Sequence, residues 1–186
     1  MKKEALLVMD MLNDFVLPGA SLEVPDTRLI IPVIQKEIEN ARATGNPVIY
    51  VCDAHAPDDK EFRKFGWPVH AVKGTRGSEV VAELKPASGD LVILKDTYTG
   101  FHGTSLDETL KSLGVESIRL TGCVTHICIM FTAMEGVVRD YHVTVVENGV
   151  AGLAREDHDA ALRIMKNVMG VNIVKSGTEV SGRKAA

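Results

Sequence analysis

The chain alternates short apolar runs with stretches in which apolar residues recur at helical spacing. Residues 5–9 are apolar without polar alternation, which is typical of a strand buried on both faces. Residues 29–43 place Ile30, Ile34 and Ile38 on one side of a helix. The same pattern predicts further strands at residues 47–52, 91–94, 117–121, 142–147 and 171–174, and further helices at residues 78–84, 104–113, 129–139 and 157–169.

Strands that alternate with helices predict an α/β fold, because crossover helices make successive strands parallel and cover both faces of the sheet. We expect a three-layer α/β/α, doubly wound domain with a mostly parallel sheet of about six strands. The length of 186 residues fits one domain, spanning residues 1–186. Residues 53–78 lack periodicity, and loops of that length are often functional. The polar tail, residues 175–186, is expected at the surface, and a role in subunit contact stays open.

Composition, charge and cysteine content exclude several classes of protein. Hydrophobic residues make up 45% and charged residues 25% of the chain, which excludes disorder for the bulk of it. The net charge of -4 argues against a nucleic-acid partner. The first apolar run, residues 5–9, is too short for a signal peptide or a membrane span, so we expect a cytoplasmic protein with no membrane partner. Cys52, Cys123 and Cys128 show no paired spacing, which argues against a disulfide framework.

Titratable side chains follow several of the predicted strands. Asp10 follows the first strand, Asp53 the second and Lys95 the third, while the fourth leads to Cys128. Ligands of open parallel sheets bind outside the carboxyl ends of the strands, so these side chains belong to one candidate site. No glycine fingerprint or phosphate-loop lysine motif follows a strand, which leaves a nucleotide site without support. The edge of the sheet is suited to covalent chemistry.

Cys128 lies at the start of the helix after the fourth strand, where the helix dipole favours a thiolate. A nearby Lys95 would lower the pKa of the Cys128 thiol further, and Asp10 could take its proton and pass it to a leaving group. The backbone N–H groups of Val124 and Cys128 could hold the oxyanion of a tetrahedral intermediate. These residues predict a catalytic Asp10–Lys95–Cys128 triad. The alternative for Cys128 is a small buried hydrophobic residue.

A second cluster combines Asp53, His55 and His70. Extended alternation puts Asp53 and His55 on one side of the chain, and His70 would supply a third ligand. Two imidazoles and a carboxylate suit zinc (Zn²⁺), Fe²⁺ or Mn²⁺, with Zn²⁺ preferred. The alternative is a hydrogen-bonded surface loop. The role of His126 stays open, and structural or solvent roles are assigned to the other histidines, His102, His142 and His158.

Several segments, taken in order, carry a resemblance to a known family: residues 8–15, the Asp53/His55 pair, residues 67–77, Lys95 and residues 122–128. They resemble the isochorismatase-like cysteine hydrolases, and among them the nicotinamidases most closely. The resemblance implies that Asp10, Lys95 and Cys128 form the triad, and that Asp53, His55 and His70 hold a metal near the ring nitrogen of the substrate. It also implies that Phe15 and Trp67 flank a flat ring and that the peptide between residues 123 and 124 is cis.

The implied activity is hydrolysis of nicotinamide to nicotinate and ammonia through a thioester. His126 stands where the family often has an acidic residue, a departure that bears on the identity of the substrate. Two alternatives to this activity stay open. The first is a cysteine hydrolase of another carboxamide, carbamoyl or ureido substrate. The second is a catalytically silent metal- or ligand-binding protein with the same fold. The resemblance also implies a homo-oligomer, either a dimer or a tetramer.

Overall fold

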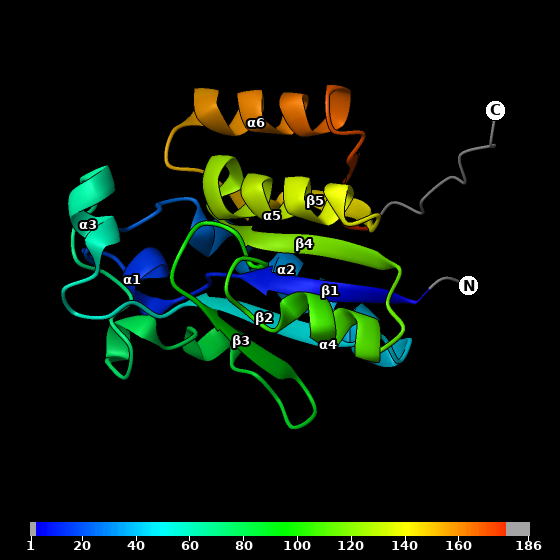
Figure 1. The fold of residues 1–186 in the computed structure, drawn as a ribbon, viewed down its shortest axis with the longest axis horizontal. Coiled ribbons are helices and arrows are strands. Elements are labelled where there is room, and N and C mark those ends of the chain that lie inside the picture. The colour runs from blue at the N-terminus through cyan, green and yellow to red at the C-terminus, as the bar shows by residue number, and fades with distance from the viewer. Residues whose placement is uncertain (1–2, 178–186) are drawn as a thin grey trace.

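The computed structural model of the protein describes residues 3–177 and is built on a parallel β-sheet (Figure 1). The strands in that range are β1 (Glu4–Met9), β2 (Val48–Asp53), β3 (Leu91–Lys95), β4 (Ser117–Cys123), β5 (His142–Ala151) and β6 (Asn172–Val174). They lie in the order β3-β2-β1-β4-β5-β6, and every neighbouring pair is parallel. The order proceeds outward from β1 in both directions, so the predicted doubly wound sheet is confirmed.

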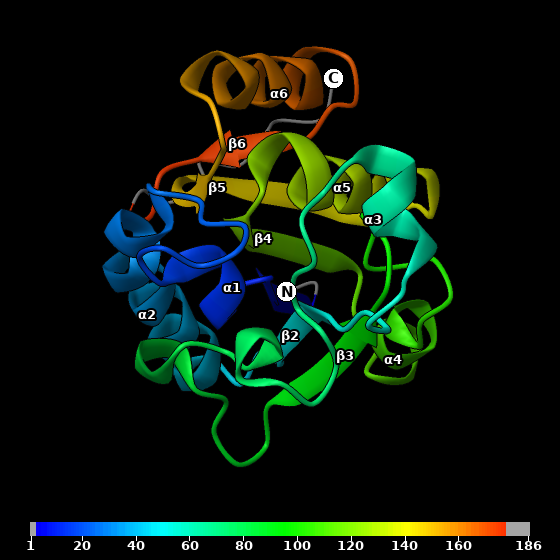
Figure 2. The ribbon, with the colours of Figure 1, turned by 90° about the vertical axis from the view of Figure 1, so that its left-hand side faces the viewer.

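Helices cover both faces of this sheet. The longer ones are α2 (Thr27–Ala43), α4 (Leu106–Ser112), α5 (Met130–Val138) and α6 (Arg155–Asn167). Two short helices, α1 (Asn13–Val16) and α3 (Lys60–Phe65), lie in the connections. Figure 2 shows α2 on one side of the sheet and α4 and α5 on the other. The predicted three layers are therefore present.

The continuous apolar character of β1 follows from its position between two cores. Leu7 and Met9 pack with residues of α4, α5 and α6, whereas Leu6 and Val8 pack with residues of α2. Successive side chains of a strand point to opposite faces, so both sets of positions must be apolar when both faces are covered. The two cores fix β1 at the centre of the sheet, and the carboxyl end of β1 delivers Asp10 to the candidate site.

The predicted helix at residues 78–84 is wrong. Only two short 3₁₀ turns form there, Arg76–Ser78 and Ala82–Leu84. The intervening backbone pairs with the loop after β1 instead: Val80 bridges Leu12, and the Val81 N–H donates to the Met11 carbonyl at 3.0 Å. These tertiary hydrogen bonds replace the helical ones.

Strand β5 extends to Ala151, beyond the predicted end at residue 147. The turn-forming residues Asn148 and Gly149 suggest an earlier end in the sequence, but the strand continues through an irregularity in register. Leu120 pairs with Val145, whereas Gly122 pairs with Val150. Helices α1 and α3 were not predicted, because helices of four and six residues show no recognisable periodicity.

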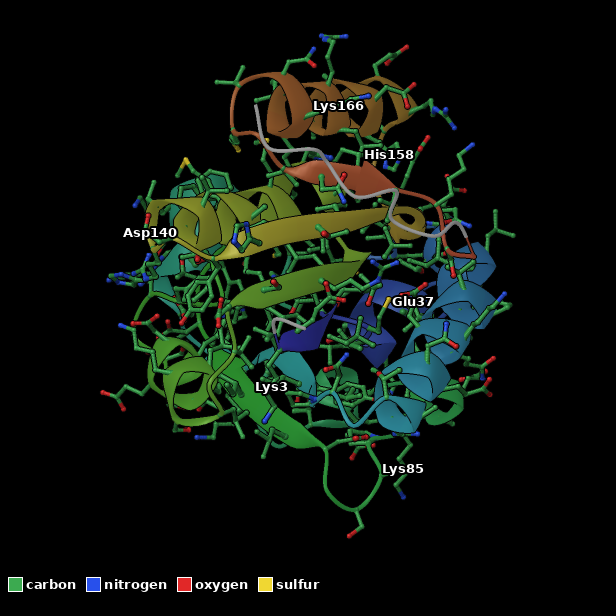
Figure 3. All side chains as sticks on the ribbon, turned by 90° about the vertical axis from the view of Figure 1, so that its right-hand side faces the viewer. Lys3, Glu37, Lys85, Asp140, His158 and Lys166 are labelled. Carbon is green, nitrogen blue, oxygen red and sulfur yellow. The ribbon has the colours of Figure 1, made fainter. Side chains whose placement is uncertain are left out.

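Among residues 3–177, no helix is long and apolar enough to cross a membrane. The start of the predicted polar tail is attached to the domain. The Ser176 hydroxyl donates to Glu37 Oε1 at 2.6 Å, and Glu37 is labelled on α2 in Figure 3. The remainder of the tail, residues 178–186, lies outside the described residues, as does any role of that segment in subunit contact.

Candidate active site

The predicted triad residues meet at the carboxyl ends of the central strands. Lys95 Nζ lies 2.9 Å from Asp10 Oδ2 and 3.5 Å from Cys128 Sγ, and it also donates to Asp53 Oδ1. The backbone N–H of Asp53 donates to Asp10 Oδ1 at 2.8 Å. All of these side chains are buried. One ammonium group therefore holds two carboxylates and the thiol in a single water-excluded cluster.

Burial and charge shift the pKa values within this cluster in opposite directions. Burial lowers the pKa of Lys95, but the carboxylates of Asp10 and Asp53 outweigh it and raise that pKa well above its usual value. Burial and the charge of Asp53 raise the pKa of Asp10 to about 6, against the attraction of Lys95. A carboxylate with this pKa is ionised at neutral pH yet basic enough to accept a proton.

The pKa of the Cys128 thiol is raised in the structure, whereas the sequence predicts that it is lowered. Burial raises the pKa of Cys128 well above its usual value, and the nearby charge of Lys95 opposes this rise without overcoming it. The negative charges of Asp10 and Asp53 raise it further, as does a hydrogen bond between the thiol and Asp10. The thiol is therefore protonated in the free protein, and Asp10 is placed to take its proton.

Cys128 lies in a π-helical turn, Thr125–Ile129, that precedes α5. The Ile129 N–H donates to the Val124 carbonyl at 3.2 Å across this turn. The peptide bond between Cys123 and Val124 is cis, as the family resemblance implies. Before it, Gly122 has φ +106°, and a Cβ there would lie 2.0 Å from the Met9 carbonyl oxygen. Only glycine allows β4 to approach the end of β1 so closely.

The predicted metal ligands also come together. His55 Nε2 lies 3.7 Å and His70 Nε2 3.9 Å from Asp53 Oδ2. The Nδ1 atom of His55 donates to Asp59 Oδ2 at 3.2 Å, and that of His70 donates to the Pro68 carbonyl at 2.7 Å. Because both partners can only accept, each Nδ1 carries a hydrogen, which leaves Nε2 as the nitrogen that can bind a metal ion once it carries no proton. Three buried donors thus converge on one point.

The environment of His55 tests whether a metal ion fits. The His55 side chain is fully buried, and its Nε2 atom has no hydrogen-bond partner among the described residues. Burial lowers the pKa of His55, but the carboxylates of Asp53 and Asp59 outweigh it and raise that pKa to about 9. Burial lowers the pKa of His70. Two buried imidazoles beside a carboxylate fit the donor set that a divalent transition-metal ion prefers, so these residues could hold such an ion.

A small pocket lies above the thiol and the metal cluster. Phe15 is buried, and its ring packs edge-on against His70 with centroids 5.3 Å apart. Trp67 donates from Nε1 to the Tyr98 hydroxyl at 3.0 Å. Both predicted aromatic residues line the pocket. Sequence reasoning missed other lining residues from the connecting loops and helices, namely Leu22, Glu61, Tyr98, Ile127 and Leu153.

His158, for which the sequence predicts a structural or solvent role, contacts the turn that carries Cys128. Its Nδ1 atom lies 2.8 Å from the hydroxyl of buried Thr125, so α6, where Figure 3 labels His158, is tied to this turn. His126 is half-buried on the same turn. Its Nδ1 atom has no hydrogen-bond partner within residues 3–177, and a Cβ at Gly152 would lie 3.4 Å from it.

The sequence and the fold are similar to those of several known proteins. A family model for the isochorismatase domain matches residues 4–176. N-carbamoylsarcosine amidase from Thermoplasma acidophilum is 39% identical, with a TM-score of 0.86 over 97% of this chain and 99% of that one. The pyrazinamidase of Pyrococcus horikoshii, solved in complex with zinc, is 32% identical, with a TM-score of 0.87 over 93% of this chain and 99% of that one.

A further relative is described as a probable inactive nicotinamidase of Arabidopsis thaliana. It is 34% identical over 176 residues, which cover 90% of each chain. The similar proteins thus include amide hydrolases with different substrates and one protein described as inactive as a nicotinamidase. The family match covers residues 4–176 and therefore includes all strands of the described sheet, from β1 to β6. The chain belongs to the isochorismatase-like hydrolase family, a family of amide hydrolases.

Proposed function

We propose that this protein is a metal-dependent cysteine amidohydrolase that converts nicotinamide to nicotinate and ammonia. The observation that carries the proposal is the contact of Lys95 Nζ with Asp10 and with Cys128 Sγ, at 2.9 and 3.5 Å, directly beside the candidate metal ligands. A silent binding protein has no need of a nucleophile, a base and a buried ammonium group in mutual contact.

The geometry supports the following sequence of steps. As the Cys128 sulfur attacks the carboxamide carbon, its proton passes to Asp10, and the backbone N–H groups of Val124 and Cys128 hold the oxyanion. The intermediate collapses, the C–N bond breaks, and Asp10 returns the proton to the leaving nitrogen, which departs as ammonia. Water then attacks the thioester while Asp10 takes a proton from it. Asp10 returns this proton to the departing sulfur, which restores the thiol, and the acid product gives its remaining proton to ammonia, so the products are nicotinate and ammonium.

Lys95 has a supporting role in these steps. Its ammonium group keeps Asp10 ionised before attack and stabilises the negative charge that develops on sulfur during attack. Burial alone would protonate Asp10 and leave the thiol without a base. The charge of Lys95 therefore partly offsets the effect of burial on the pKa values of Asp10 and Cys128.

Asp53, His55 and His70 would hold a divalent ion, for which we propose Zn²⁺, with Fe²⁺ and Mn²⁺ as alternatives. The zinc complex of the related pyrazinamidase supports this choice. When bound, the ion would supply a Lewis acid that fixes a ring nitrogen of the substrate. The protein residues would then orient the flat ring, with Phe15 and Trp67 contacting it.

The charge of the pocket supports a neutral substrate. Among the described residues that line it, none is arginine or lysine, and Lys95 below is already paired with two carboxylates. Glu61 adds a carboxyl group to the wall, and burial raises its pKa. A substrate that carries its own carboxylate, such as N-carbamoylsarcosine, would find no arginine or lysine among the described residues of the pocket wall to pair with it. Similarity to the N-carbamoylsarcosine amidase nevertheless makes a carbamoyl substrate the second candidate.

Ammonia release from a substrate panel tests the proposal. Zinc-loaded and metal-stripped protein would be assayed with nicotinamide, N-carbamoylsarcosine and a simple ureide. We expect nicotinamide to be hydrolysed fastest and only by the metal-loaded protein. Hydrolysis of N-carbamoylsarcosine in preference to nicotinamide would establish the carbamoyl alternative. Absence of ammonia from every compound, with zinc bound, would favour the silent binding protein.

A further inference from the structure

Asp59 belongs to none of the predicted clusters, yet its carboxylate joins two parts of the site. Its Oδ2 atom accepts a hydrogen bond from His55 Nδ1 at 3.2 Å. Its Oδ1 atom accepts one from the backbone N–H of Glu61 at 2.9 Å, which makes Asp59 the N-cap of α3. One side chain therefore contacts a candidate metal ligand and the start of a helix that lines the pocket.

The contact with His55 has a defined consequence for metal binding. A ligating histidine is held in the correct orientation and tautomer when its other ring nitrogen donates to a carboxylate, and this contact also makes the ligating nitrogen more basic. His55 is fully buried, and among the described residues Asp59 is the hydrogen-bond partner of its Nδ1 atom. His70 obtains the same kind of support from the Pro68 carbonyl, which no side-chain substitution removes.

Helix α3 provides a second link between Asp59 and the candidate metal ligands. Phe62, in the first turn of this helix, packs against both histidine rings, with centroids 5.1 Å from His55 and 5.3 Å from His70. The Asp59 cap fixes where α3 begins and therefore where Phe62 lies. The cap contacts His55, and the aromatic ring that it places packs against both imidazoles.

We propose that Asp59 is a positioning residue for the metal centre, and that it ties the orientation of His55 to the placement of α3 at the pocket wall. The proposal rests on the proposed metal-dependent function. It predicts that metal affinity depends on Asp59, although Asp59 itself would not contact the ion. The competing explanation is that Asp59 serves only as a helix cap.

Substitutions at Asp59 separate the two explanations. Asp59→Asn keeps a good N-cap oxygen for α3 but removes the carboxylate charge beside His55. Asp59→Ser also keeps a cap and is too short to reach the imidazole. The matched control is Asp58→Asn, which removes the same charge at the exposed neighbouring position.

The affinity of the full chain for Zn²⁺ would be measured by competition with a chromogenic chelator at fixed pH, with circular dichroism as a check on folding. We expect both Asp59 variants to bind Zn²⁺ about 10- to 100-fold more weakly than wild type, and Asp58→Asn to match wild type. Asp59 variants within about twofold of wild type would overturn the positioning role and leave the cap alone. Absence of Zn²⁺ binding by wild type would instead refute the metal-dependent function and this proposal with it.

Discussion

Lys95→Met offers the sharpest test of the buried charge cluster. The substitution keeps most of the side-chain volume but removes the ammonium group that lies between Asp10 and Asp53. Lys95 is 3% exposed, Asp10 1% and Asp53 5%, so neither carboxylate can be rehydrated without opening the site. Breaking a buried ion pair costs about 3–5 kcal/mol. Because two carboxylates lose their partner, we expect a loss at the upper end of that range, a large part of the stability of a domain.

The assay is urea denaturation of metal-stripped protein at neutral pH, followed by circular dichroism. The double variant Asp10→Asn/Lys95→Met removes one of the two unpaired carboxylates, so it should recover part of the loss and show clear non-additivity. It also provides a folded comparison if the single variant does not fold. A loss below about 1 kcal/mol for Lys95→Met would match an exposed ion pair and would refute the buried network.

Two further substitutions test the surroundings of the site. Gly122→Ala should abolish folding, because the added Cβ would lie 2.0 Å from the carbonyl oxygen of Met9. The control is Gly103→Ala, which has φ +67° but open space around the added Cβ, so it should cost only about 1–2 kcal/mol of unfolding free energy. Similar urea midpoints for the two variants would contradict this prediction. Burial lowers the pKa of His158 in the folded protein below its usual value of 6.5. As the pH falls below 6.5, the unfolded chain therefore binds a proton at His158 before the folded protein does, and the free energy of unfolding decreases until the pH reaches the lower pKa of the folded state. Between pH 7.5 and 5, wild type should therefore lose more unfolding free energy than His158→Gln, and equal losses would refute the assignment.

The sequence predicts the central part of the site well, because it depends on strand ends. Asp10, Asp53 and Lys95 each follow an apolar run, and a parallel sheet brings the carboxyl ends of such runs together. Register completes the arrangement, since Asp53 pairs with Lys95 across β2 and β3. The positions of these three side chains follow from the apolar runs that precede them and from the rule that parallel strands end at one edge of the sheet.

Other features depend on burial and on contacts that no local pattern encodes. The sequence predicts a lowered pKa for the Cys128 thiol, but in the structure the burial of this side chain raises the pKa and outweighs the charge of Lys95. Because the raised pKa favours the protonated thiol, we expect Cys128 of the free protein to react slowly with alkylating reagents. Asp59 lies in a segment without periodicity, and its importance follows only from its contact with His55.

The central claim is that Cys128 is the nucleophile of an amide hydrolase. The most direct test is ammonia release from nicotinamide by zinc-loaded wild type and zinc-loaded Cys128→Ala, compared at equal metal occupancy and with both proteins folded. We predict a fall of about 10³-fold or more in kcat for Cys128→Ala, because the thioester can no longer form. A rate for Cys128→Ala within about tenfold of wild type would contradict the account.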